Sequence, residues 1–201
     1  SESHQSISIY ESKTGKLIHS NGGTWKLEGL TMTEVVEFDT DNPERVGSTV
    51  VFDININDQF LEIVGSEMKF SRLDNGAPGD LNGAWLMLAR IRDGKKQERD
   101  ISRPRKTMKI LSGTRFQWIA YNTETKKFMA TGGGSYTTIN GKYKENIEFF
   151  SRDNSKVGLN LEFDYGILTK TGDNELDYQK NWYHKGFSSN GNPINEIWTL
   201  R

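Results

Sequence analysis

The feature that most constrains the fold of this chain is an internal repeat. Residues 7–56 align on residues 118–167 without a gap, at a constant offset of 111 positions. Thirteen of the fifty aligned pairs are identical, whereas average residue usage gives roughly three by chance. The identical pairs are Tyr10/Tyr121, Thr14/Thr125, Lys16/Lys127, Gly22/Gly133, Gly23/Gly134, Glu34/Glu145, Glu37/Glu148, Phe38/Phe149, Val46/Val157, Gly47/Gly158, Phe52/Phe163, Asp53/Asp164 and Ile56/Ile167. A match of this length indicates a duplicated module, so both copies are expected to share one fold.

The repeat divides the chain into two unequal copies. The match resumes at the end of each copy, where residues 67–72 align on residues 196–201. Residues 81–114 have no counterpart in the first copy, whose front was either lost in evolution or removed from the chain. We therefore expect a truncated first β-repeat over residues 1–72, a linker rich in turn residues over 73–80, and a complete repeat over 81–201 with about 18 extra residues around 169–195.

The repeated segments alternate apolar and polar residues with a period of two, which is typical of half-buried β-strands. The residues expected to share the inner face are Tyr143, Glu145, Ile147 and Phe149 in the second copy, and Met32, Glu34, Val36 and Phe38 in the first. Turn signals such as 140–141 and 172–174 separate the strands, and twenty Gly against four Pro fit a turn-rich chain. The pattern predicts an all-β protein built as an antiparallel up-and-down barrel, with a truncated first copy of about six strands that cannot close alone.

The start of the second copy resembles a known family. Leu81-Asn82-Gly83-Ala84-Trp85 resembles the Gly-x-Trp start of lipocalin and fatty-acid-binder (calycin) barrels. The run from Phe116 to Gly158 is similar to lipocalin-like domains of unknown function in secreted bacterial proteins. The resemblance implies a lipocalin-like barrel in which an Arg near the last strand, here Arg201, stacks across Trp85. It also implies a secreted, periplasmic or cell-envelope location, and a chain that starts at Ser1 fits a removed signal peptide.

Glu145 is the strongest candidate for a functional side chain. Period two points its carboxylate into an apolar interior, where burial is costly without a partner. One interpretation is a polar anchor in an aromatic pocket, partnered by Arg115, Arg90 or Tyr165; the other is a satisfied internal salt bridge. Its repeat mate Glu34 is expected to point inward too, whereas Glu37 and Glu148 face the other way and are expected to be solvated.

The leading functional hypothesis is non-enzymatic binding of a small, partly apolar ligand inside the second barrel. The residues expected to contact it are Trp118, Tyr136, Tyr143, Glu145, Phe163, Tyr165, Trp182 and His184. One alternative is a structural or interaction module of the bacterial cell envelope, with a barrel packed solid by side chains. A second is an enzyme that uses Glu145 and His184 as acid–base partners, although no catalytic motif is recognisable.

Composition and charge exclude several other classes. The chain has no Cys, so disulfides and Cys-ligated metals are excluded, and its three His form no repeated metal set. A net charge of −1 argues against a nucleic-acid binder, and no apolar run is long enough to span a membrane. We expect no metal and no cofactor. The expected partners are a small hydrophobic or anionic ligand and a second copy of the chain that pairs with the open edges of residues 1–72.

Three segments carry weaker signals. Residues 90–109 hold nine Lys or Arg, which form either a lid that favours an anionic ligand or a solvated hairpin. Residues 39–44 are acidic, which favours a plain turn over a calcium loop. The glycines at 132–134 predict a bulge or a tight turn, where glycine accepts a positive φ.

Overall fold

The computed structural model of the protein is all-β, and it describes residues 1–74, 79–170 and 179–201. The centre of the expected linker and the turn expected at 172–174 lie outside these described residues. The first sheet contains β1 (His4–Tyr10), β2 (Leu17–Glu28), β3 (Thr31–Asp39), β4 (Thr49–Ile56), β5 (Phe60–Ile63) and β6 (Lys69–Ser71). The second contains β7 (Gly83–Arg92), β8 (Lys95–Glu98), β9 (Arg105–Leu111), β10 (Arg115–Asn122), β11 (Lys127–Ile139), β12 (Lys142–Phe150), β13 (Asn160–Lys170), β14 (Gln179–Phe187) and β15 (Pro193–Leu200). Two short 3₁₀ turns, Pro43–Arg45 and Asn154–Lys156, occupy equivalent places in the two copies.

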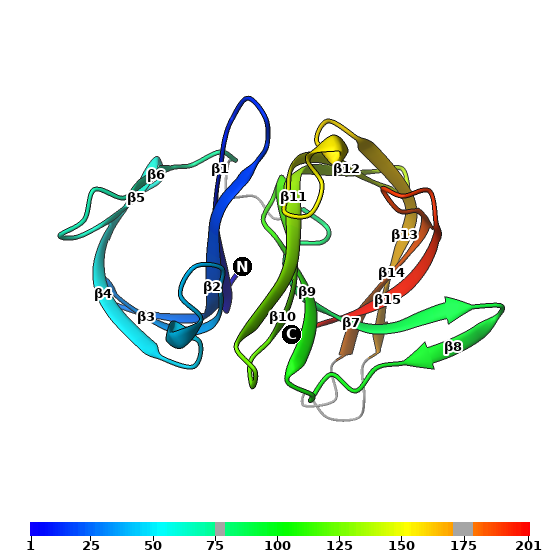
Figure 1. The fold of residues 1–201 in the computed structure, drawn as a ribbon, viewed down its shortest axis with the longest axis horizontal. Helices are drawn as coiled ribbons and strands as arrows, with labels where there is room; N and C mark the ends of the chain where they lie inside the picture. The colour runs from blue at the N-terminus through cyan, green and yellow to red at the C-terminus, as the bar shows by residue number, and fades with distance from the viewer. Residues whose placement is uncertain (75–78, 171–178) are drawn as a thin grey trace.

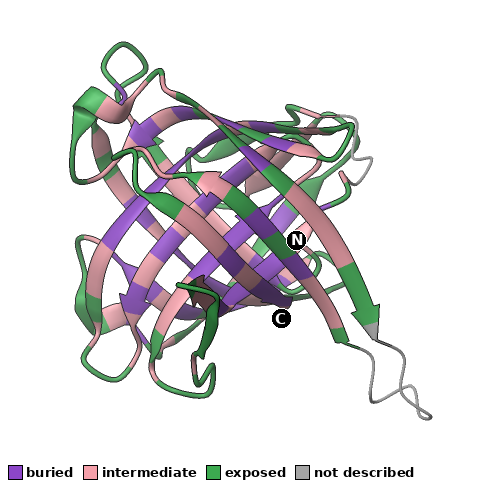
Figure 2. Ribbon diagram, turned by 90° about the vertical axis from the view of Figure 1, so that its right-hand side faces the viewer, coloured by how far each residue is buried: buried purple, intermediate pink, exposed green. Residues whose placement is uncertain are grey.

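The second sheet closes into an up-and-down barrel, as the repeat pattern predicted. Its strands run in the order β15-β14-β13-β12-β11-β10-β9-β7-β8, and β15 also pairs with β7. Of these nine strands only β8 stands outside the ring, so eight strands form the barrel. The β7–β8 hairpin projects from it (Figure 1). Buried and exposed residues alternate along the barrel strands (Figure 2), because successive side chains point to opposite faces of a sheet.

The first sheet is a curled half-barrel of six strands in sequence order, β1 to β6 (Figure 1). By the repeat, β1 to β6 correspond to β10 to β15, so the strands without a counterpart are β7, β8 and β9. The edges of β1 and β6 pair with no other strand among the described residues. The first copy is therefore the same barrel with the strands that would close it missing. No helix among the described residues is long and apolar enough to cross a membrane.

A β-bulge sits at the same place in both copies. Gly134 pairs with Ile147 and Gly133 pairs with Phe149, so Glu148 is the extra residue on β12. The first copy repeats this with an extra Glu37 on β3. The glycines are needed because a Cβ at Gly134 would collide with the backbone oxygen of Asn146. The bulge is confirmed, but the expected positive φ was wrong, because a close backbone approach and not a left-handed conformation requires glycine here.

The bulge corrects the expected inner face. The extra residue shifts the alternation by one, so Phe38 and Phe149 leave the inner face and pack between the copies. Phe149 stacks on Tyr10 with ring centroids 4.8 Å apart, and Phe38 packs on Tyr121 at 5.4 Å. Because Tyr10 and Tyr121 are also a repeat pair, the contacts are reciprocal, as in an interface with a two-fold axis.

The expectation that Glu37 and Glu148 are solvated was also wrong. Tyr10 Oη donates to Glu148 at 2.9 Å, and Tyr121 Oη donates to Glu37. A guanidinium completes each set, because Arg115 pairs with Glu148 and Arg201 pairs with Glu37. Arg201 is thus part of the interface between the copies, and the ammonium that lies over the Trp85 ring is that of Lys180.

Candidate functional site

The residues expected to bind a ligand in the second copy come together inside the closed barrel. Tyr136, Tyr143, Phe163 and Trp182 are buried in one apolar cluster, against which Trp118 and Tyr165 also pack. Glu145 and His184 are buried as well. The rings of Trp85, Phe116 and Trp198 belong to the same crowded interior. The structure therefore places these side chains together, but as a packed core.

Glu145 pairs with a lysine that was not among its expected partners. Lys109 Nζ on β9 donates to Glu145 Oε1 at 2.6 Å, and Tyr143 Oη donates to the same oxygen at 2.8 Å. The expected partners are occupied elsewhere: Arg115 pairs with Glu148, Arg90 pairs with Glu196, and Tyr165 donates to Asp80. Glu145 is thus a satisfied internal salt bridge, the second of the two interpretations. Period-two alternation does not reveal this partner, because Lys109 shares its face of β9 with Arg105 and Thr107, whereas the apolar Met108 and Ile110 lie on the other face.

Aromatic rings surround the buried ammonium of Lys109. Its Nζ lies 5.0 Å from the ring centroid of Tyr143 and 5.1 Å from that of Trp182. Three further rings, those of Phe116, Phe163 and Trp198, lie within 5.9 Å. The faces of aromatic rings are negative, so these contacts stabilise the cation in addition to its pair with Glu145.

His184 has its own carboxylate partner. Its Nε2 lies 3.0 Å from Glu196 Oε2, while Arg90 Nε donates to Glu196 Oε1 at 3.0 Å. Burial and the nearby charge of Lys109 lower the pKa of His184. Because a carboxylate only accepts hydrogen bonds, Nε2 is the donor in the contact with Glu196. Glu145 and His184 both lie in the barrel interior, but each is engaged with a separate partner and no cavity described here reaches them.

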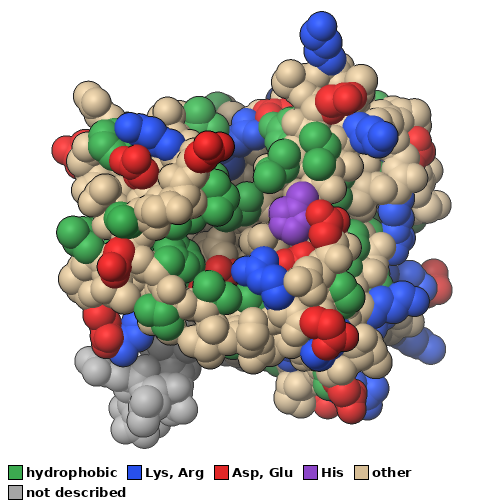
Figure 3. All heavy atoms as spheres, turned by 60° about the vertical axis from the view of Figure 1, so that its left-hand side comes forward, with side chains coloured by type: hydrophobic (Ala, Val, Ile, Leu, Met, Phe, Trp, Pro, Cys, Tyr) green, Lys and Arg blue, Asp and Glu red, His purple; other side chains and the backbone are tan. Residues whose placement is uncertain are grey.

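The large cavity of the molecule lies on the first copy. A trough of about 780 Å³ follows the concave face of the half-barrel and is bounded on one side by the second copy. Its apolar walls include Ile7, Ile9, Val50, Phe52, Leu61, Ile63, Met68 and Phe70 from the first copy, and Ile110, Leu111 and Phe116 from the second. Figure 3 looks onto this side of the molecule, where hydrophobic side chains border a hollow next to charged groups.

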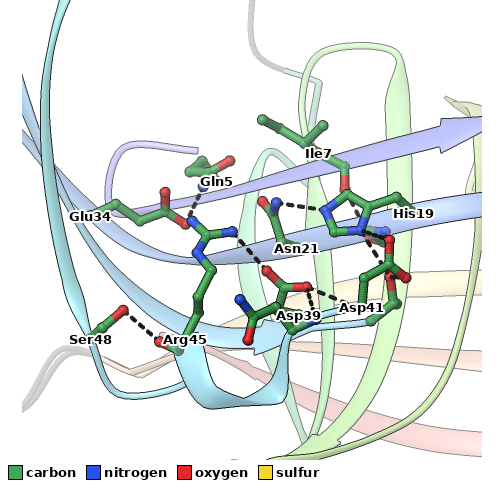
Figure 4. A network of polar contacts seen from close by, with 12 residues as sticks. Gln5, Ile7, His19, Asn21, Glu34, Asp39, Asp41, Arg45 and Ser48 are labelled. Atoms are coloured by element: carbon green, nitrogen blue, oxygen red, sulfur yellow. Dashed lines mark hydrogen bonds and ion pairs between the residues drawn. The ribbon is translucent and has the colours of Figure 1, made fainter.

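Polar residues gather along one part of the trough (Figure 4). Gln5 Nε2 donates to Glu34 Oε1 at 2.6 Å, and burial raises the pKa of Glu34, although the Gln5 bond offsets part of the rise. Next to this pair, Arg45 Nη1 donates to Asp39 Oδ2 at 2.7 Å. Asp39 also accepts the backbone N–H groups of 41 and 42, so the acidic segment 39–44 is a turn organised around this carboxylate.

Smaller side chains in the first copy explain why it is hollow where the second is full. The inward positions of Phe116, Trp118 and Tyr143 are occupied by Gln5, Ile7 and Met32 in the aligned first copy. Each exchange removes an aromatic ring from the interior. The ligand site was expected in the second copy because its aromatic residues suggested a pocket. The alignment of the two copies is a better guide to the cavity, since it shows that the first copy has smaller side chains at positions where aromatic rings fill the second.

The basic segment 90–109 divides between the surface and the core. Arg92, Lys95 and Lys96 are exposed on the β7–β8 hairpin, whereas Lys109 is buried. A smaller cavity of about 230 Å³ lies at the base of this hairpin, against residues 188–196. Within the described ranges, no group of three or more His, Asp or Glu side chains is placed to hold a metal ion. Comparisons with protein-family models and with curated proteins returned no match.

Proposed function

We propose that this protein binds a small, partly apolar ligand, and that the binding site is the trough of the first copy. The observation that carries the proposal is the 780 Å³ cavity on the concave face of the half-barrel. Its volume is within the range of small-molecule sites, which combine apolar walls with a few polar groups that fix orientation. The trough has that composition, with Glu34, Gln5 and Arg45 beside aliphatic and aromatic walls.

The filled interior of the second copy supports a ligand site in the first copy. The second copy contains the same six strands and closes into a barrel. Its interior is filled by aromatic rings, among them the fully buried Trp85, Trp182 and Trp198. Eight-stranded barrels either pack solid or hold one small ligand. The second copy is of the solid kind, whereas the six strands of the first copy leave an open trough. The filled barrel supports the hollow one through the reciprocal interface between them.

Filling the trough tests the proposal. The double variant Ile7→Trp, Met32→Tyr copies the residues Trp118 and Tyr143 of the second copy into the first. Octanol, octanoate and octylammonium serve as probes by calorimetric titration. At least one probe is expected to bind the wild type and to lose tenfold or more in affinity for the double variant. Val51→Trp, at an exposed position, is the matched control and should bind as the wild type does. No binding of any probe would contradict the proposal.

A second candidate function, a protein-interaction module, is favoured by the edges of β1 and β6, which pair with no strand in the described part of the chain. Exposed strand edges pair readily with a further strand, including one from a second copy of the chain. Sedimentation across a hundredfold range of concentration tests this candidate. Self-association that Phe70→Lys on β6 weakens would support it, because lysine on an edge strand opposes pairing. A monomer at every concentration would rule out a homodimer formed through these edges.

A further inference from the structure

Glu34 is a buried carboxylate whose partner is neutral. Glu34 is only 5% exposed to solvent, yet it lines the trough. Among the described residues it belongs to no ion pair, and its hydrogen bond is the one that Gln5 donates. An ionised carboxylate taken out of water is costly unless a cation or several donors compensate it. Gln5 supplies one neutral donor, so the site is open to a stronger partner.

The second copy shows what partner this position takes. Glu145 is the repeat mate of Glu34, and its partner is the primary ammonium of Lys109 at 2.6 Å. Lys109 reaches the interior from β9, and the half-barrel has no strand that corresponds to β9. The place that the Lys109 ammonium fills in one copy therefore corresponds to the open trough in the other.

The other charges beside Glu34 do not replace that cation. Arg45 is the nearest positive side chain, and it is engaged with Asp39, a carboxylate whose side chain is 1% exposed. Farther along the trough, His19 Nδ1 lies 2.9 Å from Asp41 Oδ2. The other guanidinium that lines the trough, that of Arg115, is likewise engaged, with Glu148. Since both guanidiniums are paired with other carboxylates, Glu34 is left as the carboxylate that a cationic ligand group could pair with in a trough of largely apolar walls.

We propose that the ligand of the trough carries a primary ammonium or a similarly compact organic cation at one end of an apolar body, and that Glu34 is its counterion. This inference rests on the proposed function. The carboxylate would accept hydrogen bonds from the ammonium, as Glu145 does from Lys109. The apolar body would lie along the walls formed by Ile7, Val50 and Phe52, where burial of its surface adds affinity. A charge-assisted hydrogen bond in this setting is stronger than a neutral one, so the head group decides the preference.

The experiment compares three probes that share one chain length and differ only in the head group. Octylammonium is expected to bind the wild type at least tenfold more tightly than octanol, and octanoate more weakly than both. Glu34→Gln keeps the shape of the side chain and removes its charge, and it should abolish the preference while octanol binding is retained. Glu162→Gln removes an exposed carboxylate from the outside of the second barrel and is the charge-matched control.

A second variant tests the inference without changing Glu34. Gln5→Lys places an internal ammonium beside Glu34, and it should also remove the preference for octylammonium because the counterion is then supplied from within. Equal binding of the three probes to the wild type would overturn the cation inference and leave the binding function standing. A preference that survives in Glu34→Gln would overturn it as well. If none of the probes binds, the binding function fails and the inference fails with it.

Discussion

At the scale of single residues, the buried pair of Lys109 and Glu145 is the most demanding feature of the second barrel. Both side chains are almost inaccessible to water, at 7% and 5% exposure. Breaking such a pair leaves a charge buried without its partner and costs about 3–5 kcal/mol. The two halves are not equivalent here, because aromatic ring faces stabilise the ammonium but repel the carboxylate.

We therefore expect Lys109→Met to lower the free energy of unfolding by about 5 kcal/mol and Glu145→Gln by about 3 kcal/mol. The double variant should recover much of the loss, because it leaves neither charge unpaired. Urea denaturation of the four proteins measures the coupling. Losses that simply add in the double variant would contradict the account.

His4 makes stability depend on pH. It is 3% exposed, and burial together with the charge of Arg201 lowers its pKa to about 4. Between about pH 6.5 and 4 the unfolded chain binds a proton that the folded chain does not, so stability falls as the pH falls. The slope from one such group is about 1.4 kcal/mol per pH unit at most.

His4→Gln should reduce that slope by about 1 kcal/mol per pH unit. It should not abolish the slope, because the pKa of buried His184 is also lowered and this ring titrates in the same direction. Urea titrations at several values between pH 4.5 and 7 measure the difference. An unchanged slope in the variant would show that His4 accepts a proton in the folded protein.

At the scale of elements, the bulge explains where sequence-based prediction succeeded and failed. The strands, their order of succession and the inward direction of Glu34 and Glu145 follow from period-two alternation. Alternation cannot register one extra residue, so it placed Phe38 and Phe149 on the wrong face. The partner of Glu145 was missed for another reason, since Lys109 lies in a segment that its positive charge marked as surface.

The bulge also makes a prediction about its glycines. Gly134→Ala places a Cβ against the backbone oxygen of Asn146, which cannot move without breaking the ladder between β11 and β12. We expect a loss of about 2–4 kcal/mol in the free energy of unfolding, with Gly23→Ala comparable in the first copy. Thr137→Ala, at an exposed position of β11, is the control and should change stability by less than about 1 kcal/mol. Thermal and urea denaturation measure these effects. Tolerance of Gly134→Ala would show that the bulge can relax.

At the scale of the whole molecule, the two copies are joined face to face through equivalent residues. The half-barrel lacks closing strands, so much of its stability must come from this face. Phe38 packs into a cluster of Ala84, Leu86, Met108, Ile110, Ile119 and Tyr121 on the outside of the second barrel. Neither the face nor the trough could be read from one copy alone, because both depend on how two similar modules meet.

The reciprocal hydrogen bonds across this face provide the last prediction. Tyr121 is fully buried and Tyr10 only partly so, although they are a repeat pair. Tyr121→Phe leaves the Glu37 carboxylate with fewer donors in a dry setting and should cost about 2–3 kcal/mol, whereas Tyr10→Phe should cost about 1 kcal/mol. Hydrogen exchange measured separately on β1–β6 and β7–β15 tests how the loss is distributed. If the half-barrel depends on the interface, Tyr121→Phe will speed exchange in β1–β6 more than in β7–β15, because the closed barrel retains its own core. Equal acceleration in both sheets would instead mean that the two copies unfold as one unit.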